Sequence, residues 1–473
     1  MFTISSKHFY VEKSIDVKAL FSAFCHQPWA IWLDSCGNEM TTPHVDSNFD
    51  IMVWQPEITL TTRGDKTEIK WLKENKTRVS DENPLNLVKE IQQQCFDNIE
   101  VTSNHLPFNG GSLGYFSYDL GRRFEVLPNQ TTQDIDFAEM SIGIYLHALI
   151  FDHKEQQLWL VCPETERESL TRYINEQLTL ANKTQLTKET FSLTNNWQSN
   201  MDKASYDEKF QHVQNYLLSG DCYQINLAQR FSANYQGNEF DAYCALRETN
   251  KAPFSAFLRF ENSSVLSISP ERFLQKNESK VQSKPIKGTK PRSDNPKVDQ
   301  QNSIDLLNSE KDRAENLMIV DLLRNDISKV CVPGSVKVPK LFDIESFPAV
   351  HHLVSTVEGE LSKAYKATDL LAASFPGGSI TGAPKIRAME IIDELEPHQR
   401  SIYCGSIGYI SACGNMDTNI TIRTLLCEKN TVSNENTIYC WAGGGVVADS
   451  KVECEYQETF DKVNKILPVL SAL

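Results

Sequence analysis

The sequence lacks the features of a membrane-bound, exported or cysteine-ligated metal protein. None of its apolar runs approaches the roughly 18 residues that a membrane-spanning helix needs. Its first residues, MFTISSKHFYVEKS, lack the basic and then apolar pattern of a signal peptide. The 12 cysteines include no C-x-x-C pair, and even Cys404 and Cys413 lie nine positions apart, which argues against a zinc site. We therefore expect reduced, mostly buried thiols in a cytoplasmic protein.

Excess positive charge is also absent. The 473 residues carry a formal net charge of −15, so we expect neither a nucleic acid nor an anionic membrane surface as a partner. A hydrophobic content of 40% with 23% charged residues is typical of a globular protein with a large core. If so acidic a protein binds an anionic substrate, its cations must be concentrated in one pocket.

The chain alternates strand-like and helix-like segments without an internal repeat. In the first half, residues 49–62 read as two strands around a turn, and 110–119 and 140–152 read as further strands. Polar residues dominate 180–200 and predict a connection. In the second half the strand-like runs are CYQINLAQRFSA, PFSAFLRF, SVLSIS, IYCGSIGYISA and MDTNITIRTLL. This pattern predicts a mixed α/β or α+β architecture with large sheets.

Two predicted helices carry pairs of acidic residues. In VECEYQETFDKVNKILPVL, read as one closing helix, Glu455, Glu458 and Lys462 share a face, which could be a solvated face with an i, i+4 ion pair. In KDRAENLMIVDLLRND, Asp312 and Glu315 stand among apolar residues on nearly every side, so this helix should be buried.

Buried carboxylates need a partner or a metal. Mg²⁺ fits here because it prefers oxygen ligands and often uses only one or two carboxylates directly. The alternative for the second helix is a structural salt-bridge network with Arg313 and Arg324.

Three loops could approach a ligand. In SKPIKGTKPR, Lys287 could be a surface charge, an anion anchor or a nucleophile. The segment 375–392 opens into a helix whose free N–H groups suit an anion, although it is not a Walker A loop. Residues 441–450 expose the backbone of Gly443 to Gly445. Either glycine-rich segment could also be only a tight turn.

Eight motifs occur in a fixed order: SPERF, PIKGT, DRAENLMIVDLLRND, VHHLVSTVEGEL, FPGGSITGAPK, IYCGSIGYI, TNITIRT, and AGGGVVADS followed by EYQETFDK. Together they resemble the chorismate-utilising enzymes, densely over 201–465 and more loosely upstream. The resemblance implies an α+β fold of two large antiparallel sheets packed as a sandwich with helices outside. It also implies an N-terminal region, 1–195, and a catalytic region, 201–467, that share one core.

The P-I-K-G-T form resembles the family members that make 4-amino-4-deoxychorismate, in which this lysine is the covalent nucleophile. Anthranilate synthases typically read P-I-A-G-T. The resemblance implies that attack of Lys287 on C2 would expel the C4 hydroxyl and that attack of ammonia on C4 would then expel the lysine, so that two displacements leave the amine at C4. Water-using members carry a lysine base where this chain has Gln224. The resemblance thus implies an amino-group transferase in the 4-aminobenzoate branch of folate biosynthesis.

The resemblance also implies roles for other residues. Glu271 matches the acid that protonates the departing hydroxyl, and His352, which borders the pocket, is a third expected catalytic residue beside Lys287 and Glu271. The substrate-binding set comprises Tyr403, Arg423, Thr381, Gly443, Gly444, Gly445 and Lys462. Mg²⁺ would be held by Glu315 and Glu458, with Glu455 and Asp312 supporting. Asp312 stands where anthranilate synthases usually have glutamate.

Two expectations concern other ligands and partners. The chain lacks a glutaminase signature, so ammonia is expected from a separate glutamine amidotransferase subunit. LDSCG partly resembles an L-x-S-G element of a tryptophan-binding site, which makes Ser35 a candidate residue for that site.

Two other readings compete with this one. The first is anthranilate synthase component I, and Lys287 counts against it. The second is a non-catalytic chorismate or tryptophan sensor on the same scaffold. A sensor would not need both an acid, Glu271, and a nucleophile.

Overall fold

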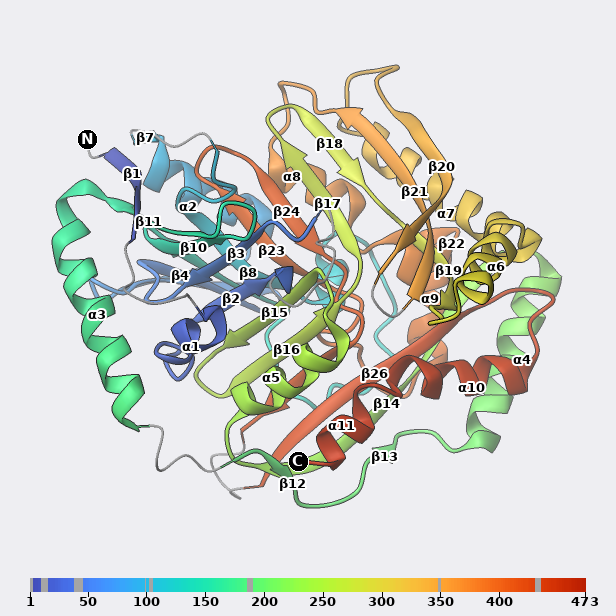
Figure 1. Cartoon of the computed structure of the whole chain (residues 1–473). Coiled ribbons are helices and arrows are strands. Elements are labelled where there is room, and N and C mark those ends of the chain that lie inside the picture. The colour runs from blue at the N-terminus through green and yellow to red at the C-terminus, as the bar shows by residue number, and fades with distance from the viewer. Residues whose placement is uncertain are drawn as a thin grey trace.

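The computed structural model describes residues 3–9, 16–37, 46–97, 99–101, 105–184, 190–347, 350–429 and 435–473. They form an α+β fold in which two large sheets carry helices on their outer sides (Figure 1). Within these ranges, no helix is long and apolar enough to cross a membrane. All 12 cysteines are free thiols, and most are buried, as the sequence predicts.

The larger sheet has 14 strands, and every pair is antiparallel except β1 with β7. Its strands run in the order β12 (Ser192–Leu193), β14 (Gln224–Gln236), β26 (Asn436–Val446), β25 (Thr424–Glu428), β16 (Ser263–Ser269), β15 (Phe254–Arg259), β2 (Ile31–Asp34), β3 (Phe49–Val53), β10 (Ala148–Asp152), β11 (Gln157–Pro163), β1 (Thr3–His8) and β7 (Glu100–Val101), with β13 (Gln198–Ser199) and β22 (Gly382–Ala383) also paired to β14.

The second sheet has 12 strands and is antiparallel. Its strands run in the order β19 (Ile286–Pro291), β21 (Val350–Glu360), β18 (Lys280–Ser283), β17 (Arg272–Asn277), β24 (Met416–Asn419), β23 (Ser406–Ser411), β8 (Gly111–Phe116), β9 (Met140–Tyr145), β4 (Ile58–Arg63), β5 (Lys66–Trp71) and β6 (Lys76–Ser80), with β20 (Lys337–Ser346) paired to β21.

Alternating residues of the larger sheet enter two different cores. Ile31 on β2 belongs to the main hydrophobic cluster, which also contains Leu60 and Ile142 of the second sheet. The next residue, Trp32, belongs to a second cluster with Tyr243. Side chains alternate between the faces of a strand, so the main cluster fills the space between the two sheets. This is the sandwich that the resemblance implies.

Strands from both sequence regions pair within each sheet. Phe257 lies opposite Trp32 in the larger sheet, and Ile407 lies opposite Tyr115 in the second. A boundary between 195 and 201 stays a prediction.

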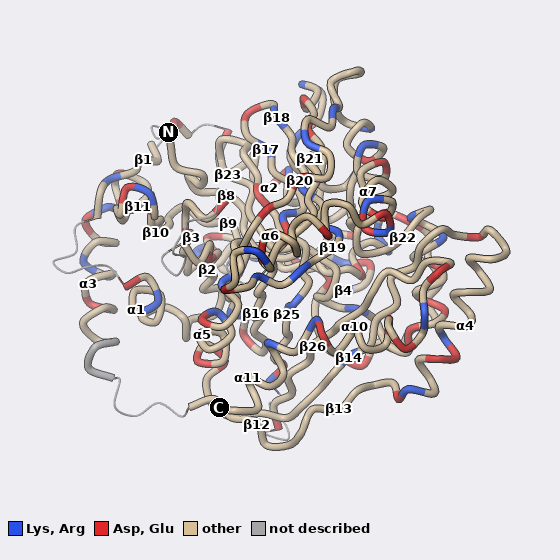
Figure 2. The backbone as a smooth tube through the Cα atoms, turned by 45° about the vertical axis from the view of Figure 1, so that its right-hand side comes forward, with Lys and Arg blue, Asp and Glu red and all other residues tan. Residues whose placement is uncertain are grey.

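The helices cover the outer faces of the sheets (Figure 1). They are α1 (Val17–Ser22), α2 (Pro84–Phe96), α3 (Arg167–Thr184), α4 (Lys203–Ser219), α5 (Glu239–Asn250), α6 (Pro296–Leu307), α7 (Glu310–Ser328), α8 (Ala367–Ser374), α9 (Lys385–Leu395), α10 (Val452–Val463) and α11 (Leu467–Ser471). Basic and acidic residues are interspersed over the elements, and both signs occur around α7 and α10 (Figure 2).

Three predicted elements are wrong in their extent. The strand expected over 140–152 is two strands, β9 and β10, which belong to different sheets. The closing helix breaks into α10 and α11, because Pro468 lacks the N–H that would continue the helix and instead occupies the first turn of α11.

The strand expected over 416–426 breaks between β24 and β25, where Arg423 adopts a left-handed φ of 50°. A left-handed residue cannot continue a strand.

The helix α7 is buried on one side only. Ile319 and Leu323 are buried, whereas Leu317 is 45% exposed. The prediction of a helix buried on nearly every side was therefore wrong, although the helix itself is confirmed.

Candidate active site

A cavity of about 500 Å³ brings most of the predicted site residues together. It is lined from β14 and β26 of the larger sheet, β19 and β21 of the second sheet, and the helices α7 and α10. The predicted residues on its wall are Glu271, Lys287, Asp312, Glu315, His352, Tyr403, Arg423, Gly443, Gly445, Glu455, Glu458 and Lys462.

Two predicted residues, Thr381 and Gly444, do not themselves line the cavity. The fully buried Thr381 hydroxyl donates to the Gly377 carbonyl, and its neighbours Ser379 and Ile380 line the cavity instead. A β-carbon at Gly444 would point toward the carboxylates of α10, because successive residues of a strand such as β26 face opposite sides. Lining residues that the sequence reasoning missed are Asn226, Lys311, Ser379 and Trp441.

Lys287 reaches the cavity from an irregularity in β19. The pairing register with β21 shifts between Lys287 and Thr289, as in a β-bulge. Gly288 between them has a φ of 76°, and a β-carbon there would lie 2.8 Å from side-chain atoms of Asp312 and Leu306. Only glycine fits this position, and the shift aims Lys287 into the site.

The Lys287 side chain is only 15% exposed. Burial lowers the pKa of its amine, and the charge of Lys462 adds to this effect, while Glu315 opposes it. The ammonium nitrogen lies 3.9 Å from a Glu315 carboxylate oxygen. The surroundings therefore shift the titration of Lys287 toward the neutral amine, which is the nucleophilic form.

Glu271 is the buried carboxyl nearest in sequence to this strand. Burial raises the pKa of Glu271 to about 7, although the charge of Lys287, the Ile286 N–H and the Ser379 hydroxyl all act to lower it. The Glu271 carbonyl accepts from the Ile420 N–H, which ties this segment to the end of β24. A carboxyl with a pKa near 7 can donate a proton at neutral pH.

His352 lies on β21 opposite Thr289. Its Nδ1 is 2.9 Å from the Thr289 hydroxyl, and its ring packs at 5.2 Å from that of Phe347. These contacts fix the ring at the border of the cavity.

Glutamates from two helices face the cavity together. Glu315 lies on α7, and Glu455 and Glu458 lie on α10. A β-carbon built at Gly444 would lie 3.1 Å from a carboxylate oxygen of Glu455 and 3.3 Å from one of Glu458. Both carboxylates thus approach the same bare stretch of backbone. An all-oxygen donor set of this kind fits Mg²⁺.

In this structure lysine side chains lie close to the carboxylates of Glu315 and Glu458 and offset their negative charge. The Glu315 carboxylate is 3.9 Å from Lys287 and 3.8 Å from Lys311, and Glu458 is 2.7 Å from Lys462. In the described part of the chain, no three His, Cys, Asp or Glu side chains already form a metal-ligand cluster. A magnesium ion bound by Glu315 and Glu458 would therefore replace the lysine contacts of these two carboxylates.

The structural alternatives for the two acidic helices are wrong in part. Arg313 lies over the ring of Phe342, and Arg324 pairs with Asp321, so neither neutralises Asp312 or Glu315. The expected ion pair between Glu458 and Lys462 exists, but Glu455 is buried and accepts from the Ser450 hydroxyl at 2.6 Å.

Arg423 presents an unpaired guanidinium to the cavity. Its left-handed backbone lies in the break between β24 and β25. No acceptor among the described residues pairs with its guanidinium, and burial alone lowers its pKa. Beside it, Tyr403 stacks on Trp441 with an interplanar angle of 4°. A half-buried cation without a partner is suited to a carboxylate ligand.

Arg400 and Glu396 hold this wall from behind. The fully buried Arg400 donates to Glu396 at 2.6 and 2.9 Å, to the Ile380 carbonyl at 3.0 Å and to the Asn226 carbonyl at 2.7 Å. Glu396 in turn accepts from the Ala228 N–H. The pair therefore ties β14 to the loop that carries Ser379 and Ile380.

The sequence matches the family profile described as chorismate binding enzyme over residues 30–468. The chain belongs to the chorismate binding enzyme family. It is 52% identical to aminodeoxychorismate synthase component 1 of Escherichia coli (strain K12) over 453 residues, which cover 95% of each chain. It is also 35% identical to anthranilate synthase component 1 of Aquifex aeolicus (strain VF5) over 399 residues, 82% of this chain and 79% of that protein.

The fold agrees with a solved structure. The crystal structure of anthranilate synthase component I from Streptococcus pneumoniae TIGR4 matches with a TM-score of 0.76 and 30% identity, over 90% of this chain and 94% of that chain. The family and the fold inferred from the ordered motifs are both confirmed.

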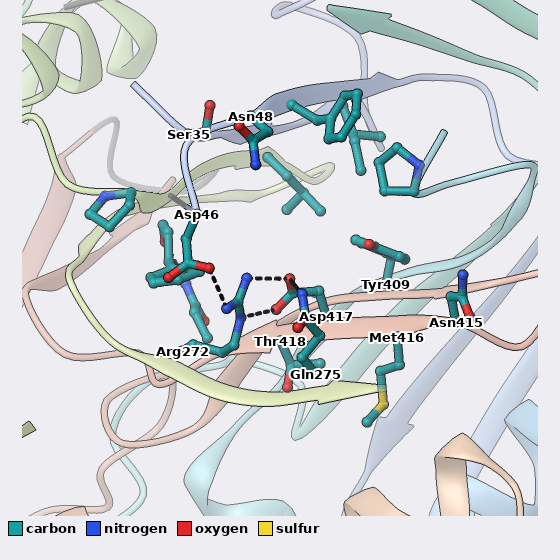
Figure 3. A pocket seen from close by; sticks show the side chains of 18 of the residues that line it. Ser35, Asp46, Asn48, Arg272, Gln275, Tyr409, Asn415, Met416, Asp417 and Thr418 are labelled. Carbon is teal, nitrogen blue, oxygen red and sulfur yellow. Dashed lines mark hydrogen bonds and ion pairs between the residues drawn. The ribbon is translucent and has the colours of Figure 1, made fainter. Parts of the chain in front are cut away.

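This chorismate binding enzyme also has a second cavity, of about 320 Å³, that shares no lining residue with the first. Arg272 projects into it between Asp46 and Asp417, with donor–acceptor distances of 2.6 to 2.9 Å (Figure 3). Ser35 lies on the opposite side, and its hydroxyl donates to the buried Asp50 at 2.7 Å. Ser35, the candidate residue of the LDSCG motif, thus lines a cavity.

Proposed function

We propose that this chain converts chorismate and ammonia to 4-amino-4-deoxychorismate, with Lys287 as the covalent nucleophile. The observation that carries this proposal is the position of Lys287, largely buried on the cavity wall with a lowered pKa. The 52% identity with aminodeoxychorismate synthase component 1 supports the same reaction. The product would enter 4-aminobenzoate and folate synthesis, and the activity would be that of an amino-group transferase.

The reaction would proceed in two displacements. The neutral Lys287 amine attacks C2 of chorismate, the ring double bond shifts, and the C4 hydroxyl leaves as water with the proton supplied by Glu271. Ammonia then attacks C4, the double bond shifts back, and the C2–nitrogen bond breaks to return the lysine. The incoming nitrogen then loses one proton, which restores the acid form of Glu271, so atoms and charges balance over the cycle.

The other residues would bind and orient the substrate. Arg423 and Tyr403 would hold the enolpyruvyl carboxylate, for which the unpaired guanidinium is suited. Lys462 adds positive charge beside the Gly443 carbonyl, to which it donates at 2.7 Å. His352 would limit the substrate's movement at the border.

Glu315 and Glu458 would hold Mg²⁺, with Glu455 and Asp312 supporting it. When bound, the ion would neutralise the ring carboxylate and disperse developing charge. The three glutamates and Asp312 all line the same cavity, which supports a shared role for them.

A glutamine amidotransferase subunit would deliver ammonia. Relatives at 52% identity bear the name component 1, which supports a second protein component as the partner.

We propose tryptophan as the ligand of the second cavity. The apolar residues around Tyr409 and Met416 and the charges of Asp46, Arg272 and Asp417 support this ligand.

One assay tests the proposed reaction against its competitors. The purified chain would be incubated with chorismate, Mg²⁺ and an ammonium salt, and aminodeoxychorismate lyase would then be added. Formation of 4-aminobenzoate supports the proposal. Anthranilate would instead support anthranilate synthase component I, and unchanged chorismate would support a sensor.

A further inference from the structure

The strand that carries Lys287 has a partner strand on one side only. β19 lies at the edge of the second sheet, and among the described residues it pairs with β21 alone. Its register shifts directly beside Lys287, so the sheet fixes this part of the backbone weakly. Misplacing a reacting group by about 1 Å can lower a rate roughly 10²-fold. Contacts from outside the sheet must therefore help to fix Lys287.

The helix α6 lies beside β19 (Figure 1) and covers it with a single stripe of side chains. Within α6, only Asp299, Asn302, Ser303 and Leu306 are not exposed, and this spacing of i, i+3, i+4 and i+7 places them on one face of the helix. Leu306 alone is fully buried, whereas Val298 is 46% exposed. A helix that buries one large side chain adds little to the hydrophobic core, which leaves its contacts with β19 as the feature to explain.

Two contacts of this stripe reach the strand itself. The Leu306 side chain lies so close to the backbone of Gly288 that a β-carbon there would be 2.8 Å from it. Further along the strand, the Asn302 amide donates to the Pro291 carbonyl at 2.9 Å. Gly288 directly follows Lys287 in the chain, so Leu306 supports the backbone next to the proposed nucleophile.

Asp299 joins α6 to the end of the strand. Its carboxylate accepts two hydrogen bonds from the Arg292 guanidinium, at 2.9 and 3.0 Å, and one from the Ser293 N–H at 3.0 Å. The Nε2 atom of His351 on β21 lies 3.1 Å from the same carboxylate. Isolated surface ion pairs contribute little, but a bidentate pair with further hydrogen bonds has a fixed geometry. Asp299 thus connects α6 with both strands at this edge of the sheet.

We infer that Asp299, Asn302 and Leu306, which we call the α6 clamp, are positioning residues that fix β19 and thereby place the Lys287 amine for attack on the substrate. This inference rests on the proposed function, in which Lys287 forms a covalent bond with C2. The clamp acts through the backbone of β19, whereas Arg423 and Tyr403, proposed to bind the substrate, lie on other elements. Loss of the clamp should therefore slow formation of the Lys287 adduct without weakening the binding of chorismate.

The test is a single-turnover measurement of adduct formation with chorismate and Mg²⁺ and without ammonia. Intact-mass spectrometry at several chorismate concentrations gives the maximal rate and the half-saturating concentration. In Asp299→Ala we expect the maximal rate to fall at least about tenfold, while the half-saturating concentration stays within about twofold. Asp299→Asn keeps an acceptor for the Ser293 N–H and should recover part of the rate. Leu306→Ala, at the other end of the clamp, should show the same loss of rate.

Hydrogen exchange reports on the strand independently of the reaction. The backbone amides of residues 286–292 should exchange faster in Asp299→Ala than in the wild type, because the strand opens more often. Asp305→Ala is the matched control, since Asp305 is exposed on the same helix and accepts from Gln301 within it at 2.7 Å. We expect this control to match the wild type in both exchange and adduct rate.

A wild-type adduct rate in Asp299→Ala would overturn the α6 clamp. A loss of rate accompanied by an equal rise in the half-saturating concentration and a lowered thermal midpoint would also overturn it, because that combination marks a general loss of structure. If the wild-type chain forms no adduct, the proposed function itself fails before any variant is compared. The two failures are therefore distinguishable.

Discussion

The Lys287 ammonium nitrogen lies 3.9 Å from a Glu315 carboxylate oxygen, across the cavity wall formed by β19 and α7. The same glutamate is within 3.8 Å of Lys311. Glu315 thus connects the proposed nucleophile with the carboxylates proposed to bind metal. A cation that takes over Glu315 removes the contact that most favours the charged form of Lys287.

Removing one proposed metal ligand should weaken metal binding directly. In Glu315→Gln and Glu458→Gln, we expect the affinity for Mn²⁺, used as a spectroscopic substitute for Mg²⁺, to fall at least about tenfold. Electron paramagnetic resonance of free Mn²⁺ measures this without turnover. Glu390→Gln on α9, paired with Arg387 outside the cavity, is the control. Equal affinity in all four proteins would remove the metal assignment.

Glu271 should titrate near neutral pH. Its pKa of about 7 lies above the ordinary value, so the carboxyl is protonated below pH 7 and loses its proton as the pH rises through 7. Infrared difference spectra should show a protonated-carboxyl signal that disappears between about pH 6 and pH 8 and is absent in Glu271→Gln. This variant should also lose roughly 10²–10⁴-fold in kcat. A signal that persists in Glu271→Gln would belong to another group.

The buried pair behind the site should matter strongly for stability. Arg400→Met leaves Glu396 buried without its cation, and we expect a loss of about 3–5 kcal/mol in the free energy of unfolding. Adding Glu396→Leu should restore part of this loss, because the unpaired charge is then gone. Urea denaturation of the single and double variants tests this. A single variant as stable as the wild type would contradict the role of the pair.

The second cavity should bind L-tryptophan. A ligand that binds only the folded chain adds about 2.7 kcal/mol of stability at 100 times its dissociation constant, so the thermal midpoint should rise with L-tryptophan concentration. Glycine, which lacks the indole, should have little effect. Ser35→Leu, which places an apolar side chain at the wall of this cavity, should reduce the rise. A midpoint that does not respond to tryptophan at any concentration would leave this cavity without the proposed ligand.

The sequence motifs anticipated the site because each one has its own chemical reason. Lys287 needs Gly288 beside it, since the backbone there is left-handed and has no space for a β-carbon. Glu315 and Glu458 fall on helical faces that point toward the cavity. Such local requirements are visible in a single sequence.

Features that depend on contacts between distant chain segments could not be predicted from the sequence. MDTNITIRTLL has the composition of one strand, but tertiary structure breaks it at Arg423 and turns the guanidinium toward the cavity. Lys311 looks like an ordinary surface residue of α7 until α10 brings Glu455 within 4.0 Å of it. By contrast, Pro468 was a readable signal for the end of the closing helix.

Replacing the nucleophile should change the reaction. Lys287→Ala recreates the P-I-A-G-T sequence and removes the amine that attacks C2. We expect this variant to lose most 4-amino-4-deoxychorismate formation and to gain at most a trace of 2-amino product, because ammonia can now reach C2. Chromatography of the products measures both. Lys290→Ala, on the same strand but outside the cavity lining, should remain active.

Mass spectrometry of the intact chain incubated with chorismate and Mg²⁺, but without ammonia, tests the central claim most directly. We predict a covalent adduct with the mass of chorismate less one water, which proteolysis maps to the peptide containing Lys287. The adduct should disappear when ammonia is added and should not form in Lys287→Ala. An unmodified wild-type chain under all trapping conditions, together with a fully active Lys287→Ala variant, would contradict covalent catalysis by this lysine.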